Sequence, residues 1–467
     1  MIAGGLVKDK RTRSAGRRLR FVGLGVVAAT CAALVGSTAV GAGVSSAPGS
    51  GGGSDLRPVI FVHGFSGSGA QFETQAKRFT SNGYPAELIE LHDYDSGFGL
   101  ETTEDVYTRL DERIANLLEE SGADQVDLLG HSLGTRLMQE YLRSSPERAA
   151  TVAHYVNLDG FPSADPPGGV PTLAVWGVGD PGRQIGGADN VYFANQTHTQ
   201  VVTSPQTFEE IYTFFSDEEP ETTRITPEQQ IELAGRAVLF PQNAGVEGGE
   251  LEIYEVEPAT GDRVGDEPEA TYPLEGDGSW GPFEANGKKR YELAIVRPGA
   301  ATHHLYYEPF LRSDYWVRLL TSPVEGGIGA LLNVSDQHSG MVLVRYKEWW
   351  GDQGERNDVL EINGENILNP ANTPIDKRAI GVFAFDEETD GATDLSAPMA
   401  NFAGLPFITG VDLFIPASGS DTPDDTISVV STPRGGGGKE VSLNVPNWTS
   451  SSDRISVQFS DHVQGAK

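Results

Sequence analysis

Short apolar segments alternate with helix-like segments between residues 58 and 215. The segments between the apolar runs carry apolar residues at helical spacing, as at Val106, Leu110, Ile114 and Leu117. Apolar runs without polar alternation are typical of strands that are buried on both faces. The pattern therefore predicts an α/β fold with a mostly parallel sheet covered by helices on both sides. The predicted strands are PVIFV at 58–62, ELIEL at 87–91, QVDLL at 125–129, HYVNL at 154–158, PTLAVW at 171–176 and NVYFA at 190–194.

The pattern changes after about residue 222, where helical spacing fades and short alternating runs are separated by turn residues. Such runs are typical of an all-β structure. We therefore predict an α/β domain at 57–218, a small β-sandwich domain at 222–300 and a C-terminal β domain at 305–465.

The first 47 residues have the pattern of an export signal. A basic segment, KDKRTRSAGRRLR, precedes a stretch of apolar and small residues at 21–44, and a Gly/Ser-rich linker follows at 48–56. This order is typical of a cleaved signal peptide. The alternative is an uncleaved N-terminal anchor, which would be the chain's one contact with a membrane. Either interpretation places the folded part outside the cytoplasm, and we predict a secreted protein.

The charge and the cysteine content restrict the partners and the covalent structure. The net charge is −32, and a surface of this sign repels nucleic acid, so we expect no nucleic-acid partner. The single cysteine, Cys31, lies within the export segment. We therefore expect no disulfide in the mature protein.

A lone serine lies where the third apolar run meets helix-like sequence, in VDLLGHSLGTRL at 126–137. A sharp strand-to-helix turn would expose the Ser132 hydroxyl as a nucleophile, and the flanking glycines would avoid collisions with neighbouring backbone. The backbone N–H of Leu133 would then face an oxyanion at the helix N-terminus. A second N–H is expected from Phe65, in the glycine-rich loop FVHGFSGSG after the first strand.

A nucleophilic serine requires a base and an acid. Among the nine histidines, His198 lies in a loop between the last predicted strand and the last predicted helix, where a catalytic base is expected. Two aspartates, Asp159 and Asp180, each follow the end of a strand. The local pattern does not decide between them.

The chain resembles the α/β-hydrolase lipases, specifically the archaeal and bacterial long-chain lipases with an all-β C-terminal portion. The similar stretches include FVHGF, GHSLGT, VNLDG, NVYFANQTHTQ, VRYKEWWG and SVQFSDHV, and the resemblance covers nearly everything from residue 57 onward. It implies a triad of Ser132, Asp159 and His198, because the acid of this family lies in the segment that corresponds to NLDG. The sequence departs from the family by also carrying Asp180.

The resemblance implies a secreted serine carboxylic-ester hydrolase, a lipase that cleaves long-chain acyl esters of the triacylglycerol type. It would act on a lipid or ester substrate at an interface, through an acyl-enzyme, and would need no metal or organic cofactor. The alternatives are an extracellular polyester depolymerase and, from another class, a non-catalytic surface-binding protein.

An acidic turn in the C-terminal part raises the question of a structural calcium ion. Asp386, Asp390 and Asp394 are spaced four apart around Gly391. Carboxylates that converge on a tight turn could bind calcium. In so acidic a chain we favour the simpler interpretation, a solvated turn.

Overall fold

The computed structural model describes residues 56–418 and 422–462. The predicted export or anchor segment at 1–47 and almost all of the linker at 48–56 lie outside these residues. Within the described ranges, no helix combines the length and the apolar character that a membrane crossing requires.

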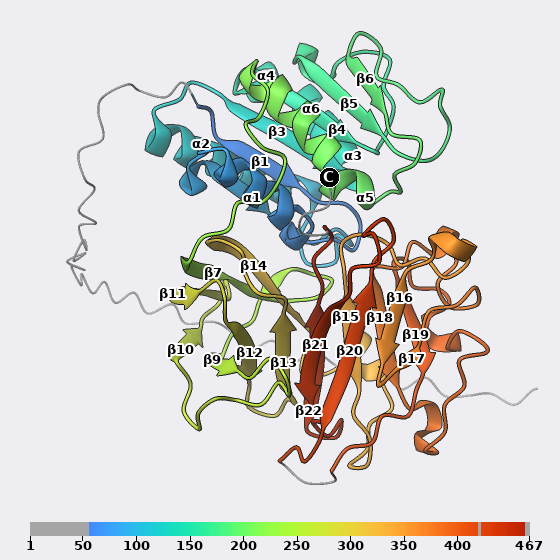
Figure 1. Cartoon of the computed structure of the whole chain (residues 1–467). Coiled ribbons are helices and arrows are strands. Elements are labelled where there is room, and N and C mark those ends of the chain that lie inside the picture. The colour runs from blue at the N-terminus through green and yellow to red at the C-terminus, as the bar shows by residue number, and fades with distance from the viewer. Residues whose placement is uncertain (1–55, 419–421, 463–467) are drawn as a thin grey trace, which may run out of the picture. The chain divides into compact units, whose positions relative to one another are not determined.

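The first half of the described chain contains the predicted parallel sheet (Figure 1). Its six strands lie in the order β2-β1-β3-β4-β5-β6, and every neighbouring pair is parallel. The strands are β1 (Val59–Val62), β2 (Ile89–His92), β3 (Val126–His131), β4 (Val152–Leu158), β5 (Thr172–Trp176) and β6 (Asp189–Tyr192). The helices are α1 (Glu73–Ser81), α2 (Thr103–Ser121), α3 (Leu133–Ser144), α4 (Pro146–Ala150), α5 (Gln200–Thr203) and α6 (Pro205–Ser216).

The two faces of this sheet are covered by different helices. Phe61 packs in one core with aromatic residues of α1 and α6, such as Phe79 and Phe208. Its neighbour Ile60 packs in a second core with residues of α2 and α3, such as Leu110. Successive side chains of a strand point to opposite faces, so a continuous apolar run supplies both cores. The predicted α/β fold class is confirmed.

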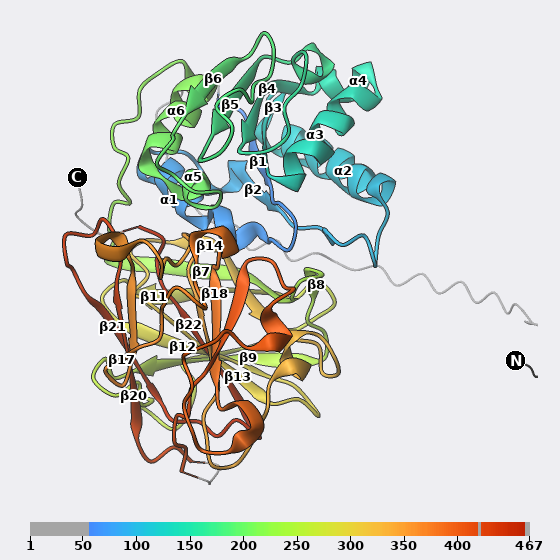
Figure 2. The ribbon, with the colours of Figure 1, turned by 90° about the vertical axis from the view of Figure 1, so that its right-hand side faces the viewer.

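The second half consists of strands, loops and single-turn helices, as Figure 2 shows in yellow-green to red. An eight-stranded sheet has the order β10-β9-β12-β13-β22-β15-β18-β19, one four-stranded sheet contains β11-β7-β14 with β8 beside β7, and another has the order β17-β16-β20-β21. The strands are β7 (Gln230–Leu239), β8 (Ala244–Gly245), β9 (Gly249–Val256), β10 (Ala270–Leu274), β11 (Ser279–Asn286), β12 (Arg290–Val296), β13 (Thr302–Tyr307), β14 (Asp314–Thr321), β15 (Met341–Val344), β16 (Val359–Ile362), β17 (Glu365–Asn366), β18 (Gly381–Phe385), β19 (Ile408–Asp412), β20 (Thr426–Thr432), β21 (Val441–Pro446) and β22 (Asp453–Gln458).

The eight-stranded sheet is continuous across the boundary that the sequence predicts at residues 300 to 305. Strand β13 pairs with β12 on one side and, in parallel, with β22 on the other. Strand β14 pairs with β7, from the start of the β-rich half. The two predicted β domains therefore share sheets, and pairing of β13 on both sides leaves no free strand edge at this position.

Strand β14 also connects the β-rich half to the parallel sheet. The indole of Trp316 belongs to the core formed by α1 and α6, and its Nε1 donates to the carbonyl of Ile89 at 3.1 Å. The buried guanidinium of Arg318 donates to Asp93, just after β2, with 2.6 Å between Nε and Oδ2. These buried contacts fix the β-rich half against the edge strand β2.

Candidate active site

Ser132 occupies a strained turn between β3, which ends at His131, and α3, which begins at Leu133. Its φ is 51° and its ψ is −119°, a region that residues with a side chain rarely adopt. Strain of this kind persists only where the surroundings impose it, and it is common at active sites. Helix α3 begins at Leu133, directly after this turn, as the sequence predicts.

The two glycines that flank Ser132 are required by close backbone approach. A Cβ at Gly134 would lie 2.5 Å from the carbonyl oxygens of Val62 and His63, and one at Gly130 would lie 2.8 Å from the carbonyl oxygen of Gly134. Neither backbone segment can yield to a side chain. The physical reason for the glycines in the sequence motif is thus confirmed.

The loop after β1 lies directly against this turn. A Cβ at Gly64 would come within 2.8 Å of the Ser132 Cβ. The loop is held by its own hydrogen bonds, from Gly67 N–H to the Gly64 carbonyl at 3.1 Å and from Ser66 N–H to Ser96 Oγ at 2.8 Å. Phe65 lies between these anchored positions, with its side chain 47% exposed.

Asp159 and His198 are joined by a hydrogen bond of 2.7 Å between Oδ2 and Nδ1. The other carboxylate oxygen accepts from Gly177 N–H at 2.8 Å and from Arg183 Nη1 at 2.9 Å. Burial alone would raise the pKa of Asp159, but the hydrogen bonds from His198 and Gly177 and the charges of His198 and Arg183 lower this pKa to about 2. The carboxylate is therefore ionised at neutral pH.

Asp180, the other aspartate that the sequence leaves open, lies on an exposed turn. Its carboxylate accepts from Gly182 N–H at 2.8 Å, two residues further along. Its side chain therefore stabilises a local turn, whereas Asp159 is the one that reaches His198.

Two residues around Ser132 hold the histidine loop and the aspartate turn in place. His131 Nε2 lies 3.0 Å from the His198 carbonyl oxygen, and the two rings are 4.6 Å apart. The Thr135 hydroxyl donates to the Ser132 carbonyl at 2.7 Å and accepts from Phe161 N–H at 2.9 Å. The turns that carry Ser132, Asp159 and His198 are thus connected directly.

The β-rich half supplies a further anchor that the sequence analysis missed. Glu348 is fully buried, and its carboxylate accepts from Thr199 N–H at 2.6 Å, from Gln200 N–H at 3.2 Å and from the Thr197 hydroxyl. These donors flank His198 on both sides. An acidic residue inside the aromatic run YKEWW was the available signal, because a buried carboxylate requires donors.

Phe407, also from the β-rich half, contacts the histidine itself. Its ring lies 6.2 Å from the His198 ring at an interplanar angle of 13°. Its φ is 65°, a strained value for an aromatic residue. The β-rich half therefore contributes directly to the surroundings of His198.

Replacement of Glu348 by glutamine should lower kcat by about tenfold to a hundredfold, because small displacements of a reacting group are costly. An amide has one acceptor oxygen and cannot serve the donors on both sides of His198. We would measure kcat and KM on a short chromogenic ester, with Glu365→Gln on an exposed strand as the matched control. An unchanged kcat with a lowered melting temperature would show that Glu348 contributes to stability alone.

The carboxylates of the acidic turn at 386–394 accept hydrogen bonds from nearby backbone N–H groups. Asp386 accepts from Asp390 and Gly391 N–H, Asp390 accepts from Ala392 N–H, and Asp394 accepts from Ser396 N–H. Within residues 56–418 and 422–462, no group of three or more His, Cys, Asp or Glu side chains is placed to hold a metal ion.

Family models match three successive parts of the chain. An alpha/beta hydrolase fold matches residues 57–198, a lipase C-terminal domain matches residues 229–324, and a further C-terminal domain model matches residues 327–463. No curated protein sequence matches the chain.

Several solved structures are similar to parts of the chain. A gene product from Listeria innocua is 13% identical with a TM-score of 0.28, over 36% of this chain and 97% of that protein. Lipase B from Aspergillus fumigatus is 14% identical with a TM-score of 0.30, over 38% of this chain and 56% of that protein. A pyrethroid hydrolase from Sphingobium faniae is 20% identical with a TM-score of 0.20, over 24% of this chain and 42% of that protein.

The family models agree with the two structural halves, since the hydrolase model falls on the parallel sheet and the lipase model on the β-rich half. The chain is a lipase-like α/β-hydrolase with a β-rich C-terminal region.

Proposed function

We propose that this protein is a secreted serine carboxylic-ester hydrolase that cleaves long-chain acyl esters through Ser132, His198 and Asp159. One observation carries the proposal. The strained Ser132 turn and the His198–Asp159 hydrogen bond occur together with an apolar cavity of about 490 Å³, whose lining reaches neighbours of the site but includes none of these three residues. Its wall includes Ser66, Gly67 and Ser68, which directly follow Phe65, and Phe407, which stacks on His198.

In this mechanism His198 takes the proton of Ser132 as the serine oxygen attacks the ester carbonyl. Ionised Asp159 holds the imidazole in the required tautomer and stabilises the imidazolium. The N–H groups of Phe65 and Leu133 stabilise the oxyanion, at about 3 kcal/mol for each donor. The alcohol leaves, and water then hydrolyses the acyl-enzyme. No metal or organic cofactor enters these steps.

Exposed apolar side chains around the site support contact with a lipid or ester interface. Phe65, Phe98, Leu100 and Phe161 are exposed by 37% to 67%. They lie on the loops that follow β1, β2 and β4. The carboxyl ends of parallel strands meet at one edge of a sheet, so these loops are on the same edge as Ser132. Apolar residues gathered on such an edge are typical of a surface that binds apolar material.

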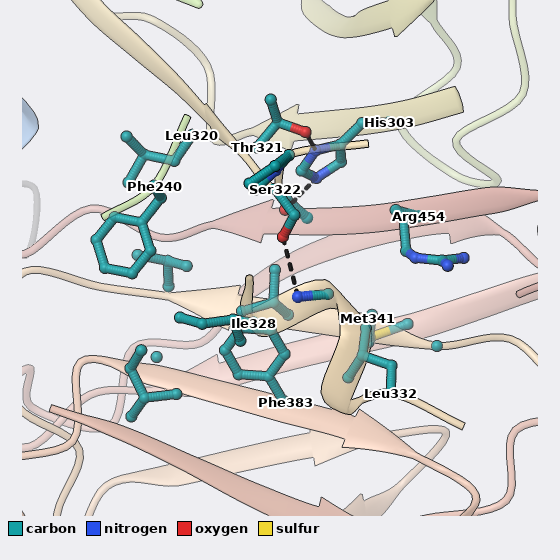
Figure 3. Close-up of a pocket in the computed structure, with 18 of the residues that line it drawn as sticks. Phe240, His303, Leu320, Thr321, Ser322, Ile328, Leu332, Met341, Phe383 and Arg454 are labelled. Carbon is teal, nitrogen blue, oxygen red and sulfur yellow. Dashed lines mark hydrogen bonds between the residues drawn. The ribbon is translucent and has the colours of Figure 1, made fainter. Parts of the chain in front are cut away.

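The cavity is lined mostly by the β-rich half and is suited to an acyl chain. Phe240, Leu320, Ile328 and Phe383 line it, as Figure 3 shows. Each buried methylene contributes about 0.8 kcal/mol, so kcat/KM should rise about fourfold for each methylene that enters. We would measure hydrolysis of p-nitrophenyl esters from butyrate to palmitate, with mass-spectrometric mapping of a phosphonate label. A label elsewhere than Ser132 would contradict the proposed nucleophile.

Gly381→Leu should shorten the acyl chains that the protein accepts. Gly381 lines the cavity, and a Cβ there would meet no atom nearer than Ile408 Cγ1 at 3.9 Å, so the new side chain would fill the cavity rather than strain the strand. The kcat/KM on palmitate should fall at least tenfold, and that on butyrate should change little. Gly265→Leu, at an exposed position with open space, is the matched control. Equal losses on both esters would place the acyl chain elsewhere.

A further inference from the structure

The cavity in the β-rich half has an unexpected charge. About one residue in seven of the chain is acidic, and the net charge is −32. The lining of the cavity nevertheless contains two arginines, Arg297 and Arg454, and neither aspartate nor glutamate. A cavity that binds only a neutral hydrocarbon chain would not require positively charged residues in so acidic a protein.

The two arginines belong to one cluster that is centred on His303. In the parallel pairing of β13 and β22, His303 is the direct partner of Arg454. The Thr321 hydroxyl bridges His303 Nδ1 at 2.8 Å and Arg297 Nη2 at 3.2 Å. Figure 3 shows His303 and Arg454 at one side of the view, with Phe240 and Leu320 at the other.

The cluster has cationic donors that the protein leaves unused. The buried Nε of Arg297 has no hydrogen-bond acceptor, while its Nη2 donates to the Thr321 hydroxyl and to the Ser322 carbonyl, the latter at 2.9 Å. Among the described residues, no carboxylate charge offsets the burial that lowers the pKa of Arg297, and Asp453 alone does so for Arg454. Arg454 uses Nη1 on the carbonyl oxygens of Ser450 and Asp453. A buried donor without an acceptor is costly, and a ligand with acceptor oxygens would remove that cost.

His303 adds a polar but neutral surface. Burial and the neighbouring charges of His304, Arg297 and Arg454 lower the pKa of His303 to about 3. Both of its ring nitrogens are engaged, with Thr321 and with Ser456. The positive charge at this end of the cavity therefore comes from the two arginines alone.

We propose that this cavity binds a long-chain carboxylate, with the carboxylate at Arg297 and Arg454 and the alkyl chain along the apolar wall. Guanidinium groups match carboxylate oxygens in geometry and charge. Binding of the carboxylate at the two arginines does not depend on catalysis. The link between this site and ester hydrolysis rests on the proposed function, and two sources could supply the carboxylate. One is a free fatty acid, the product of hydrolysis. The other is an acyl chain that ends in a carboxylate, as in the half-ester of a long dicarboxylic acid.

Binding is tested with dodecanoate by isothermal titration calorimetry on the full chain. Arg297→Gln and Arg454→Gln should each weaken dodecanoate binding about tenfold to a hundredfold. Binding of dodecanol, which has the same chain and no charge, should not change. Arg356→Gln, at an exposed position outside the cavity, is the matched control. Equal affinities for dodecanoate in all variants, or equal losses for dodecanoate and dodecanol, would overturn the proposal.

Circular dichroism confirms the fold of each variant. If Arg297→Gln does not fold, Arg454→Lys and Arg454→Gln decide the question, because lysine keeps the charge. Arg454→Lys should keep dodecanoate binding within a few-fold of the original, and a loss equal to that of Arg454→Gln would contradict a role for the charge.

The two sources are separated by kinetics. If the acyl chain carries the carboxylate, p-nitrophenyl hydrogen dodecanedioate should be preferred over p-nitrophenyl dodecanoate, and Arg454→Gln should abolish the preference. If the ligand is free product, dodecanoate should inhibit hydrolysis and Arg454→Gln should relieve the inhibition. The absence of both effects would overturn the link to catalysis. Dodecanoate binding that depends on the arginines, without hydrolysis of any ester, would contradict the proposed function and leave the binding site standing.

Discussion

Replacement of Ser132 by alanine is expected to abolish ester hydrolysis and to leave the fold unchanged. Loss of a triad serine typically costs about 10⁴-fold to 10⁶-fold in rate. The turn itself is held by two backbone hydrogen bonds of Ser132. Its N–H donates to the Leu158 carbonyl and its carbonyl accepts from Thr135 N–H, both at 3.1 Å. Alanine keeps both bonds, so only the nucleophile is lost.

The measurement is kcat on p-nitrophenyl butyrate, with circular dichroism to verify the fold. Ser396→Ala, at an exposed position of the C-terminal half, is the matched control and should behave as the unaltered chain does. Activity of Ser132→Ala near that of the control would exclude Ser132 as the nucleophile. It would show that the ester is cleaved through another nucleophile of the chain.

The sheet of the first half could be predicted because its signal is local. A strand buried on both faces must be apolar throughout, and Ile60 and Phe61 show why, since each enters a different core. Gly130 is local in the same sense, since a Cβ there would meet Gly134 and Thr135 of the same turn, whereas a Cβ at Gly134 would meet Val62 and His63, which are distant in the sequence.

The order of the β strands could not be predicted, because it depends on partners far apart in the sequence. Strand β13 pairs with β22, which begins about 150 residues later, and nothing in either run specifies the other. The contact between Glu348 and the histidine loop is of the same kind. The β13–β22 pairing and the Glu348 contact both arise from the packing of complete sheets, so neither produces a periodic pattern in the local sequence.

The triad acid could be predicted only in part, because the local pattern leaves two aspartates. Asp159 and Asp180 follow neighbouring strands, β4 and β5, and are similar by local pattern. The resemblance to long-chain lipases favours Asp159, and so does the geometry, since only the side chain of Asp159 reaches His198. The deciding factor is the path of the loop at 196–199, which Glu348 of the β-rich half holds in place.

Asp159→Asn is expected to lower kcat by about 10³-fold to 10⁴-fold. The asparagine amide would leave His198 in the wrong tautomer and without a counter-charge. The same change should also reduce stability at neutral pH. The pKa of Asp159 is lowered to about 2, below the value of about 3.9 in an unfolded chain, so its stabilisation is present above pH 4 and is lost as the pH falls toward 2. The difference, about 2 to 3 kcal/mol at pH 7, should therefore nearly vanish near pH 2.

Asp180→Asn is the matched comparison, because the same chemical change is made at the end of the neighbouring strand. Its carboxylate is exposed and accepts only from the N–H of its own turn, a bond that an asparagine oxygen can also accept. We expect kcat within about twofold of the unaltered chain, since exposed substitutions are usually nearly neutral. A loss at Asp180 that exceeds the loss at Asp159 would reverse the assignment of the acid. That result would require His198 to turn from Asp159 toward the end of β5, and it would leave Ser132 as the nucleophile and the reaction class unchanged.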